Sequence, residues 1–311
     1  MTGRVSDTFA AFADDAAIFP PGLTPLGQAV PDHVLHTRSD YSALMGPLVI
    51  GAATLIELPP HIGHMPPRSL DLSVTVPAPD GIQAVVTTCA LLPSVRLVAL
   101  EVVVPPEMSP EQVVPMLDAS LAGMDVAGGA LQVYVEVPRD ERRAGLMAAL
   151  ADSPYRAKFR TGGVKAELYP DEAELAAAIH AAVSAGVPFK ATAGLHHAVR
   201  NTDPKTGFEQ HGFLNILSAV DAAQQGGDTD ALVAILADRD GASLAQSIGS
   251  WSPERAAAAR SAFVSFGTCS VTDPLTELVD LGLIAPGSHS DTDAATATAP
   301  AESTSTEGPH A

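Results

Sequence analysis

The chain has 311 residues, of which 46% are hydrophobic, and this composition is typical of a globular protein. Its formal net charge of −19 argues against nucleic acid as its main partner. Its apolar stretches fall short of the roughly 18 residues that a membrane-spanning helix needs, and its N-terminus lacks the apolar core of a signal peptide. The two cysteines, Cys89 and Cys269, are too few for a disulfide framework. From these features together we expect a soluble cytoplasmic protein without a membrane partner.

Eight short segments rich in Val, Leu and Ile alternate along the chain with helical stretches. Near-continuous apolar runs of this kind are typical of parallel strands that are covered on both faces. Eight such units predict a (β/α)8 barrel over residues 1–286. A doubly wound open sheet is the alternative, but no Gly-x-Gly-x-x-Gly turn follows any of the segments. The expected strands are residues 16–20, 47–53, 70–76, 95–104, 131–137, 156–161, 188–193 and 262–267.

The clearest helix lies between the sixth and seventh expected strands. Asp171 is placed as its N-cap, Glu174 completes a capping box, and Gly186 is a natural C-cap. The much longer connection over residues 195–261 contains two helix-like stretches, 213–221 and 228–238. We expect it to be a helical insertion that could cover the barrel mouth, and residues 287–311 to be a disordered acidic tail.

The lysines are unusually few and unevenly placed. The chain has four, all between residues 158 and 205, against thirteen arginines spread over its whole length. Lys158 and Lys190 each lie in an apolar run that ends at glycine. A primary amine can lose its proton and attack a carbonyl carbon, whereas a guanidinium cannot.

In a barrel, side chains at the carboxyl ends of the strands face the active site. We therefore expect Lys158, Lys190, Glu101 and Glu136 to be catalytic. Two neighbouring ammonium groups lower each other's pKa, which would leave one of them partly neutral, and a glutamate could transfer protons. The alternative is structural, with each lysine neutralised by a glutamate in a buried ion-pair network.

Three short motifs occur in order at the expected strand ends. They are Lys158-Phe-Arg-Thr-Gly162, Phe189-Lys-Ala-Thr-Ala-Gly194 and Phe266-Gly-Thr-Cys-Ser270. This ordered set resembles the deoxyribose-phosphate aldolase family, Schiff-base aldolases with a (β/α)8 barrel, which carry Lys-Thr-Ser-Thr-Gly, Phe-Lys-x-x-Gly-Gly and Phe-Gly-x-Ser-Ser on strands six, seven and eight.

The resemblance implies that Lys158 is the Schiff-base nucleophile, that Lys190 depresses its pKa, and that Glu101 shuttles protons. It also implies phosphate binding by backbone amides at glycines and Ser270. Together with the other polar residues at the strand ends, the expected substrate-binding residues are Arg160, Thr161, Gly162, Thr192, Gly194, His196, Gly267, Thr268 and Ser270.

Three features depart from the family pattern, and they bear on the substrate more than on the fold. Arg160 replaces a small hydroxyl residue, His196-His197 follows Gly194, and a long segment is inserted after the seventh strand. We therefore expect an aldolase-type lyase that acts on a small carbonyl compound, phosphorylated or not, without an obligatory cofactor.

Two alternatives stay open at this point. His196, His197 and His211, together with Glu136, offer nitrogen and oxygen ligands for a metal-dependent lyase or isomerase. The other alternative is a non-catalytic barrel that binds a small anion, or an interaction protein that uses the acidic tail. The sequence leaves the oligomeric state open, a homo-oligomer included.

Overall fold

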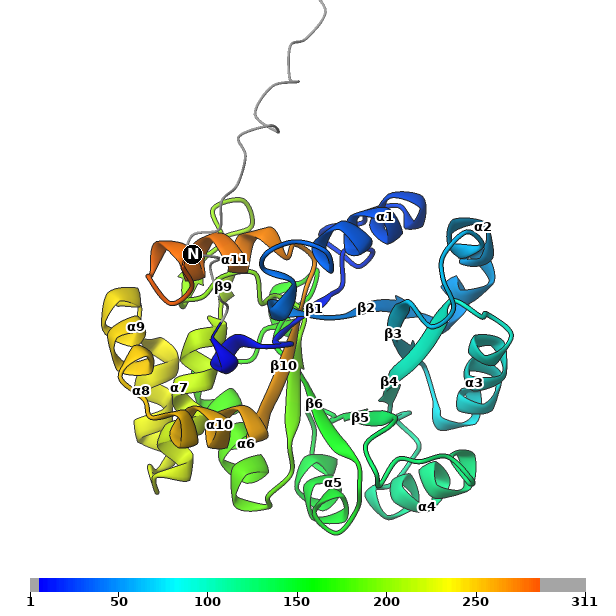
Figure 1. Cartoon of the computed structure of the whole chain (residues 1–311). Coiled ribbons are helices and arrows are strands. Elements are labelled where there is room, and N and C mark those ends of the chain that lie inside the picture. The colour runs from blue at the N-terminus through cyan, green and yellow to red at the C-terminus, as the bar shows by residue number, and fades with distance from the viewer. Residues whose placement is uncertain (1–5, 286–311) are drawn as a thin grey trace, which may run out of the picture.

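The computed structural model describes residues 6–285, and its centre is a closed barrel of eight parallel strands. Each strand pairs with the next in the chain, and β10 closes the ring between β7 and β1 (Figure 1). The predicted (β/α)8 fold is confirmed. The barrel strands are β1 (Ala13–Asp15), β2 (Met45–Gly51), β3 (Leu70–Val76), β4 (Val95–Val103), β5 (Gln132–Glu136), β6 (Arg156–Arg160), β7 (Phe189–Thr192) and β10 (Phe263–Thr268).

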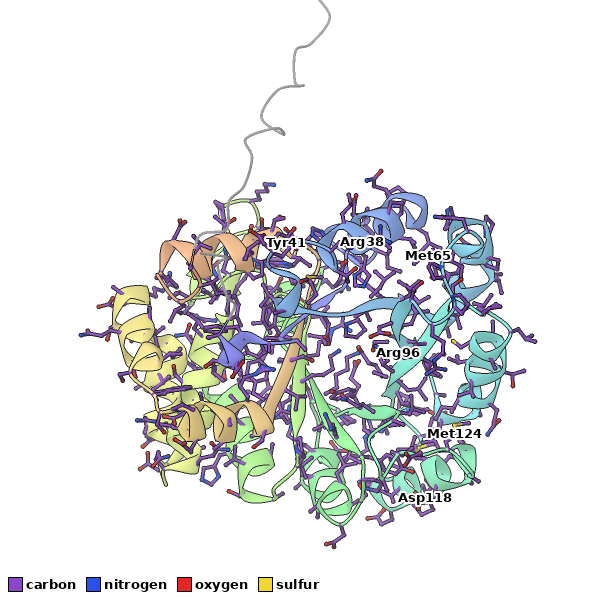
Figure 2. The ribbon with its side chains drawn as sticks, in the orientation of Figure 1. Arg38, Tyr41, Met65, Arg96, Asp118 and Met124 are labelled. Carbon is purple, nitrogen blue, oxygen red and sulfur yellow. The ribbon has the colours of Figure 1, made fainter. Side chains whose placement is uncertain are left out.

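Helices surround the barrel on its outer face. They are α1 (Leu26–His36), α2 (Pro59–Ile62), α3 (Ile82–Ala90), α4 (Pro110–Ser120), α5 (Arg142–Ala151), α6 (Glu172–Ser184), α7 (Phe213–Gln224), α8 (Thr229–Ala237), α9 (Gly241–Gly249), α10 (Pro253–Ala262) and α11 (Thr272–Asp280). A small hairpin of β8 (Asn201–Thr202) and β9 (Glu209–Gln210) follows β7. Side chains fill the ring of strands (Figure 2), so the opening in the ribbon is not a channel.

The start of α6 has the predicted N-cap but not the predicted capping box, because the Glu174 carboxylate pairs with Arg139 and Arg143 instead. The Asp171 side chain accepts a hydrogen bond from the Glu174 backbone N–H at 2.7 Å, which satisfies one of the free donors of the first turn. After the last turn, Gly186 takes a φ of +64°, a conformation that favours glycine. The predicted limits of this helix are confirmed.

The prediction for the first strand is wrong. The expected strand was residues 16–20, but the strand is Ala13–Asp15, and both of its aspartates are buried. Two adjacent aspartates are typical of an exposed segment and not of a barrel strand. The segment is buried because the carboxylate of Asp14 is paired with a lysine inside the barrel.

The long connection after β7 lies on the flank of the barrel rather than over its mouth (Figure 1). Helix α7 packs on the outer face of β10, where the rings of Phe213 and Phe266 stack at 4.5 Å, and α8 packs outside α6 and α7. Of residues 195–261, only His196 lines the cavity at the mouth. The expectation that this insertion covers the mouth is therefore wrong. The predicted tail, residues 287–311, lies outside the described residues.

Candidate active site

A cavity of about 250 Å³ lies at the carboxyl ends of the barrel strands. Lys158 and Arg160 reach it from β6, Glu101 from β4 and Glu136 from β5, and residues of the other strands or of the loops that follow them complete its wall. Parallel strands bring their carboxyl ends to one side of the barrel, and this is where (β/α)8 enzymes carry their active sites.

Five charged side chains form a continuous ladder from the barrel interior to this cavity. The Nζ atom of Lys190 lies 2.5 Å from Asp14 Oδ2 and 2.6 Å from Glu101 Oε1. The other carboxylate oxygen of Glu101, Oε2, lies 2.8 Å from Lys158 Nζ, which is also 3.0 Å from Glu136 Oε2. We call Asp14, Lys190, Glu101, Lys158 and Glu136 the charged ladder.

Four members of the ladder are almost completely buried, since Lys190 is 0% exposed, Glu101 1%, Asp14 3% and Lys158 6%. Burial of ions is costly unless each one is paired and hydrogen-bonded. Two serines supply further hydrogen bonds: Ser73 Oγ donates to Glu101 at 2.8 Å, and Ser265 Oγ donates to Asp14 at 2.8 Å. Both serines are buried in the barrel.

The pairing sets the protonation state of the ladder. Burial by itself lowers the pKa of the Lys158 amine, but the carboxylates of Glu101 and Glu136 outweigh it and raise this pKa. The same holds for Lys190, where Asp14 and Glu101 raise the pKa. Burial alone would raise the pKa of Glu101, yet the two lysines hold it well below its usual range.

The expectation that the two lysines depress each other's pKa is therefore wrong. Lys158 and Lys190 are register partners on adjacent strands. However, the Glu101 carboxylate lies between their amines and bonds to both of them. Its negative charge lies within 2.8 Å of each ammonium group and raises the pKa of both amines.

Five of the predicted substrate-binding residues line the cavity. Arg160 lies at its edge, with Nε donating to the Gly162 carbonyl at 3.0 Å and Nη1 lying 3.8 Å from Glu136. His196 lies against the thiol of Cys269, with Nδ1 3.4 Å from Sγ. Burial lowers the pKa of His196 and raises that of Cys269. The five residues are Arg160, Thr192, Gly194, His196 and Gly267.

Four other predicted substrate-binding residues lie outside the cavity wall. The Thr161 hydroxyl donates to the Ala193 carbonyl at 2.7 Å, and Gly162 lies against the ring of Tyr169. Thr268 donates to the Ser270 carbonyl at 2.8 Å, and the Ser270 hydroxyl accepts from the backbone N–H of Asp273 at 3.3 Å. The three hydroxyl groups form hydrogen bonds within or between the loops instead of facing the cavity. The four are Thr161, Gly162, Thr268 and Ser270.

The three histidines of the metal hypothesis do not converge. His197 pairs with Glu277 at 2.6 Å, and that hydrogen bond raises its pKa. His211 lies against the Pro170 carbonyl at 2.8 Å, and burial lowers its pKa to about 4. Within residues 6–285, no group of three His, Cys, Asp or Glu side chains is placed to hold a metal ion. The proposed histidine ligand set is wrong.

Three residues of the site were not predicted from the sequence, namely Asp14, Ser73 and Ser265. Asp14 directly follows the apolar pair Phe12-Ala13. A carboxylate in such a context was the sequence signal that could have identified Asp14 as a buried residue. Its neighbour Asp15 points to a different partner, His33 Nδ1 at 2.9 Å. Nothing in the sequence around the two serines separates them from ordinary polar residues of a strand.

The chain matches no protein-family model and no curated protein sequence. Among solved structures, it is similar to Rhizobium etli pyruvate carboxylase with the allosteric activator acetyl coenzyme-A, at 13% identity and a TM-score of 0.35. That match covers 82% of this chain and 25% of the carboxylase chain, so the chain spans about a quarter of the length of that protein. A likeness this weak does not bear on activity.

None of the helices in the described part of the chain is long and apolar enough to span a membrane.

Proposed function

We propose that this protein is a Schiff-base lyase of the aldolase type, which acts on a small carbonyl compound and uses no cofactor for the carbon–carbon step. The observation that carries the proposal is the position of Lys158. Among the described residues it is the lysine that lines the cavity, and two carboxylates lie within 3.0 Å of its Nζ atom. The three motifs that resemble deoxyribose-phosphate aldolases support the same chemistry.

Lys158 must first lose a proton, because only the neutral amine attacks a carbonyl carbon. Glu136 is the better acceptor, since its side chain is 19% exposed at the cavity, whereas Glu101 is 2% exposed and is shared with Lys190. The proton transfer turns a buried ion pair into a neutral pair. Removal of both charges from a poorly solvated place offsets part of the lost ion-pair energy.

The neutral amine then adds to the carbonyl carbon and gives a carbinolamine. Protonation by Glu136 lets the hydroxyl leave as water, and an iminium ion remains on Lys158. The electron pair of the bond between the α- and β-carbons then forms a C=C bond and the C=N pair moves onto nitrogen, which gives an enamine, while the Glu136 carboxylate removes the proton from the hydroxyl of the departing aldehyde. Glu136 returns this proton to the enamine carbon, and water hydrolyses the resulting iminium ion, which releases the second carbonyl product and frees Lys158. Glu101, fixed by Lys190 and Ser73, keeps a negative charge beside the developing cation.

Borohydride reduction tests this assignment. The protein would be incubated with a panel of small aldehydes and ketones, reduced, and analysed by intact mass and peptide mapping. We expect a single stable adduct on Lys158 of the wild-type protein. The Lys158→Arg variant should give no adduct, because a guanidinium does not form an imine.

The exposed Lys165 offers a matched control. Lys165→Arg should retain the full adduct, and circular dichroism should show that both variants are folded. Adducts spread over exposed lysines, or an undiminished adduct in Lys158→Arg, would contradict the proposal. A folded wild-type protein that gives no adduct with any carbonyl would favour the non-catalytic alternative, in which the ladder only neutralises its own charges.

A further inference from the structure

Much of the cavity wall is apolar. Phe19 and Val164 lie in the loops at its mouth, and Val49 and Val103 contribute from the strands. Val164 is 67% exposed, so a ligand that covered it would remove apolar surface from water. A cavity of about 250 Å³ is at the small end for ligand sites, which limits the ligand to a few carbon atoms.

The loops after β7 and β10, where the resemblance implies a phosphate site, already use several of their donors. The Ala198 backbone N–H donates to Glu277 Oε2 at 2.5 Å. In the loop before α11, the Ser270 N–H donates to the Thr268 hydroxyl and the Asp273 N–H donates to the Ser270 hydroxyl, both at 3.3 Å. An anion there would have to displace these internal bonds.

Two glycines that the resemblance assigns to phosphate have a packing role instead. A Cβ atom on Gly162 would lie 2.6 Å from the Tyr169 ring, and a Cβ atom on Gly194 would lie 2.8 Å from the same ring. Both residues are glycine because Tyr169 occupies the space beside them. Their conformation is therefore explained without a bound anion.

The cations that line the cavity are also paired with carboxylates already, which is unfavourable for a dianion. Asp273 and Glu277 belong to α11, and the Asp273 charge contributes to the raised pKa of the Cys269 thiol, which lines the cavity. Glu277 is paired with His197, with Nδ1 2.6 Å from Oε1. Arg160 is 3.8 Å from Glu136, and Lys158 is paired with two carboxylates. A phosphate in the cavity would have to compete with Glu101 and Glu136 for these two cations.

We infer that the substrate is a small unphosphorylated aldehyde or ketone, and that the part of it remote from the carbonyl is a short apolar chain. This inference deepens the proposed Schiff-base function and rests on it for the identity of the reacting group. The apolar wall binds the chain, and the carboxylates that already pair with Lys158 and Arg160 disfavour phosphorylated analogues.

Ligand-observed NMR with unreactive analogues tests the inference without any need for lysine chemistry. We expect 1-butanol to bind at least about tenfold more tightly than butyl phosphate, as expected when a dianion faces carboxylates. Val164→Asn should weaken the binding of 1-butanol, because it replaces part of the apolar wall. Leu91→Asn, which alters a residue that is 75% exposed and outside the cavity wall, should not.

Borohydride trapping with butanal, glyceraldehyde and glyceraldehyde 3-phosphate completes the test, and the two possible failures can be told apart. Faster trapping of the phosphorylated aldehyde, tighter binding of butyl phosphate, or no binding of either analogue would overturn the inference about substrate class. Preferential binding of 1-butanol that depends on Val164, with no adduct from any carbonyl, would support the ligand class and overturn the lysine chemistry alone.

Discussion

The protonation of Lys158 is decided by two carboxylates at close range. Its amine is buried in the barrel, where loss of hydration alone would favour the neutral form, yet Glu101 and Glu136 raise its pKa. A Schiff-base enzyme with this arrangement depends on a carboxylate that can take the proton when the carbonyl arrives. The carboxylates thus fix the position of the amine and also oppose the loss of its proton.

This balance predicts the effect of Glu136→Gln on the pH dependence of adduct formation. Removal of one carboxylate lowers the pKa of Lys158, so the rising limb of the rate should move to lower pH by about one unit or more. The maximal rate should fall, because the proposed proton acceptor is lost. Both are measured by borohydride trapping from pH 5 to 10.

The exposed Glu107 provides the control, since Glu107→Gln leaves the ladder unchanged. A rising limb at the same pH in the Glu136→Gln and wild-type proteins would show that Glu136 does not set the protonation of Lys158.

At the level of elements, the loops after β6 and β7 are held together by Tyr169. Its ring lies against Gly162 in one loop and Gly194 in the other, and a Cβ atom on either glycine would approach the ring within 3 Å. Gly194 also has a φ of +76°, which disfavours any residue with a Cβ atom. The loop that follows Arg160 and the loop that carries His196 therefore have a fixed relation to one another.

Gly194→Ala should lower the free energy of unfolding by about 2–4 kcal/mol, since it combines a strained backbone with a clash against Tyr169. The comparison is Gly207→Ala, where φ is +72° but nothing lies within 4 Å of the added atom. That variant should lose only about 1–2 kcal/mol, the cost of the backbone strain. Urea unfolding measures both, and equal losses would show that contact with Tyr169 is unimportant.

At the scale of the whole molecule, the charged ladder runs through the barrel interior, a region that is usually filled by apolar layers. Its inner end, Asp14, lines another cavity of about 270 Å³, which also contacts Arg156 and Arg260. Its outer end, Glu136, lines the candidate active site. Most of the remaining core is aliphatic and aromatic, so the ladder is a polar axis within an apolar barrel.

Lys190→Met should reveal how the ladder contributes to stability. Burial already raises the pKa of Asp14 although Lys190 opposes the rise, so without the lysine this pKa should rise further. A carboxyl group whose pKa is higher in the folded than in the unfolded state does not destabilise the fold while it is protonated. It lowers the free energy of unfolding as the pH rises through the folded pKa. The decrease in the free energy of unfolding should be small near pH 5 and reach about 3–5 kcal/mol near pH 8.

Urea unfolding at the two pH values measures this difference, with Lys165→Met as the exposed control, for which we expect a change within about 0.5 kcal/mol. A loss for Lys190→Met that does not depend on pH would mean that the damage comes from packing and not from an unpaired carboxylate.

The sequence by itself determined the barrel, seven of its eight strands and the limits of α6, because these depend on local periodicity and capping. It also identified the two lysines and the two glutamates as charges inside the barrel, because a charged residue in an apolar run is rare. It placed β1 wrongly, since a buried aspartate looks like a surface residue until its partner is known, and Lys190 is far away in the chain. The tertiary structure alone decided that Glu101 lies between the two amines, that the glycines pack on Tyr169, and that α7 to α10 lie on the flank. Each of these depends on contacts between distant segments, where charge and close packing act over a few ångströms regardless of separation along the chain.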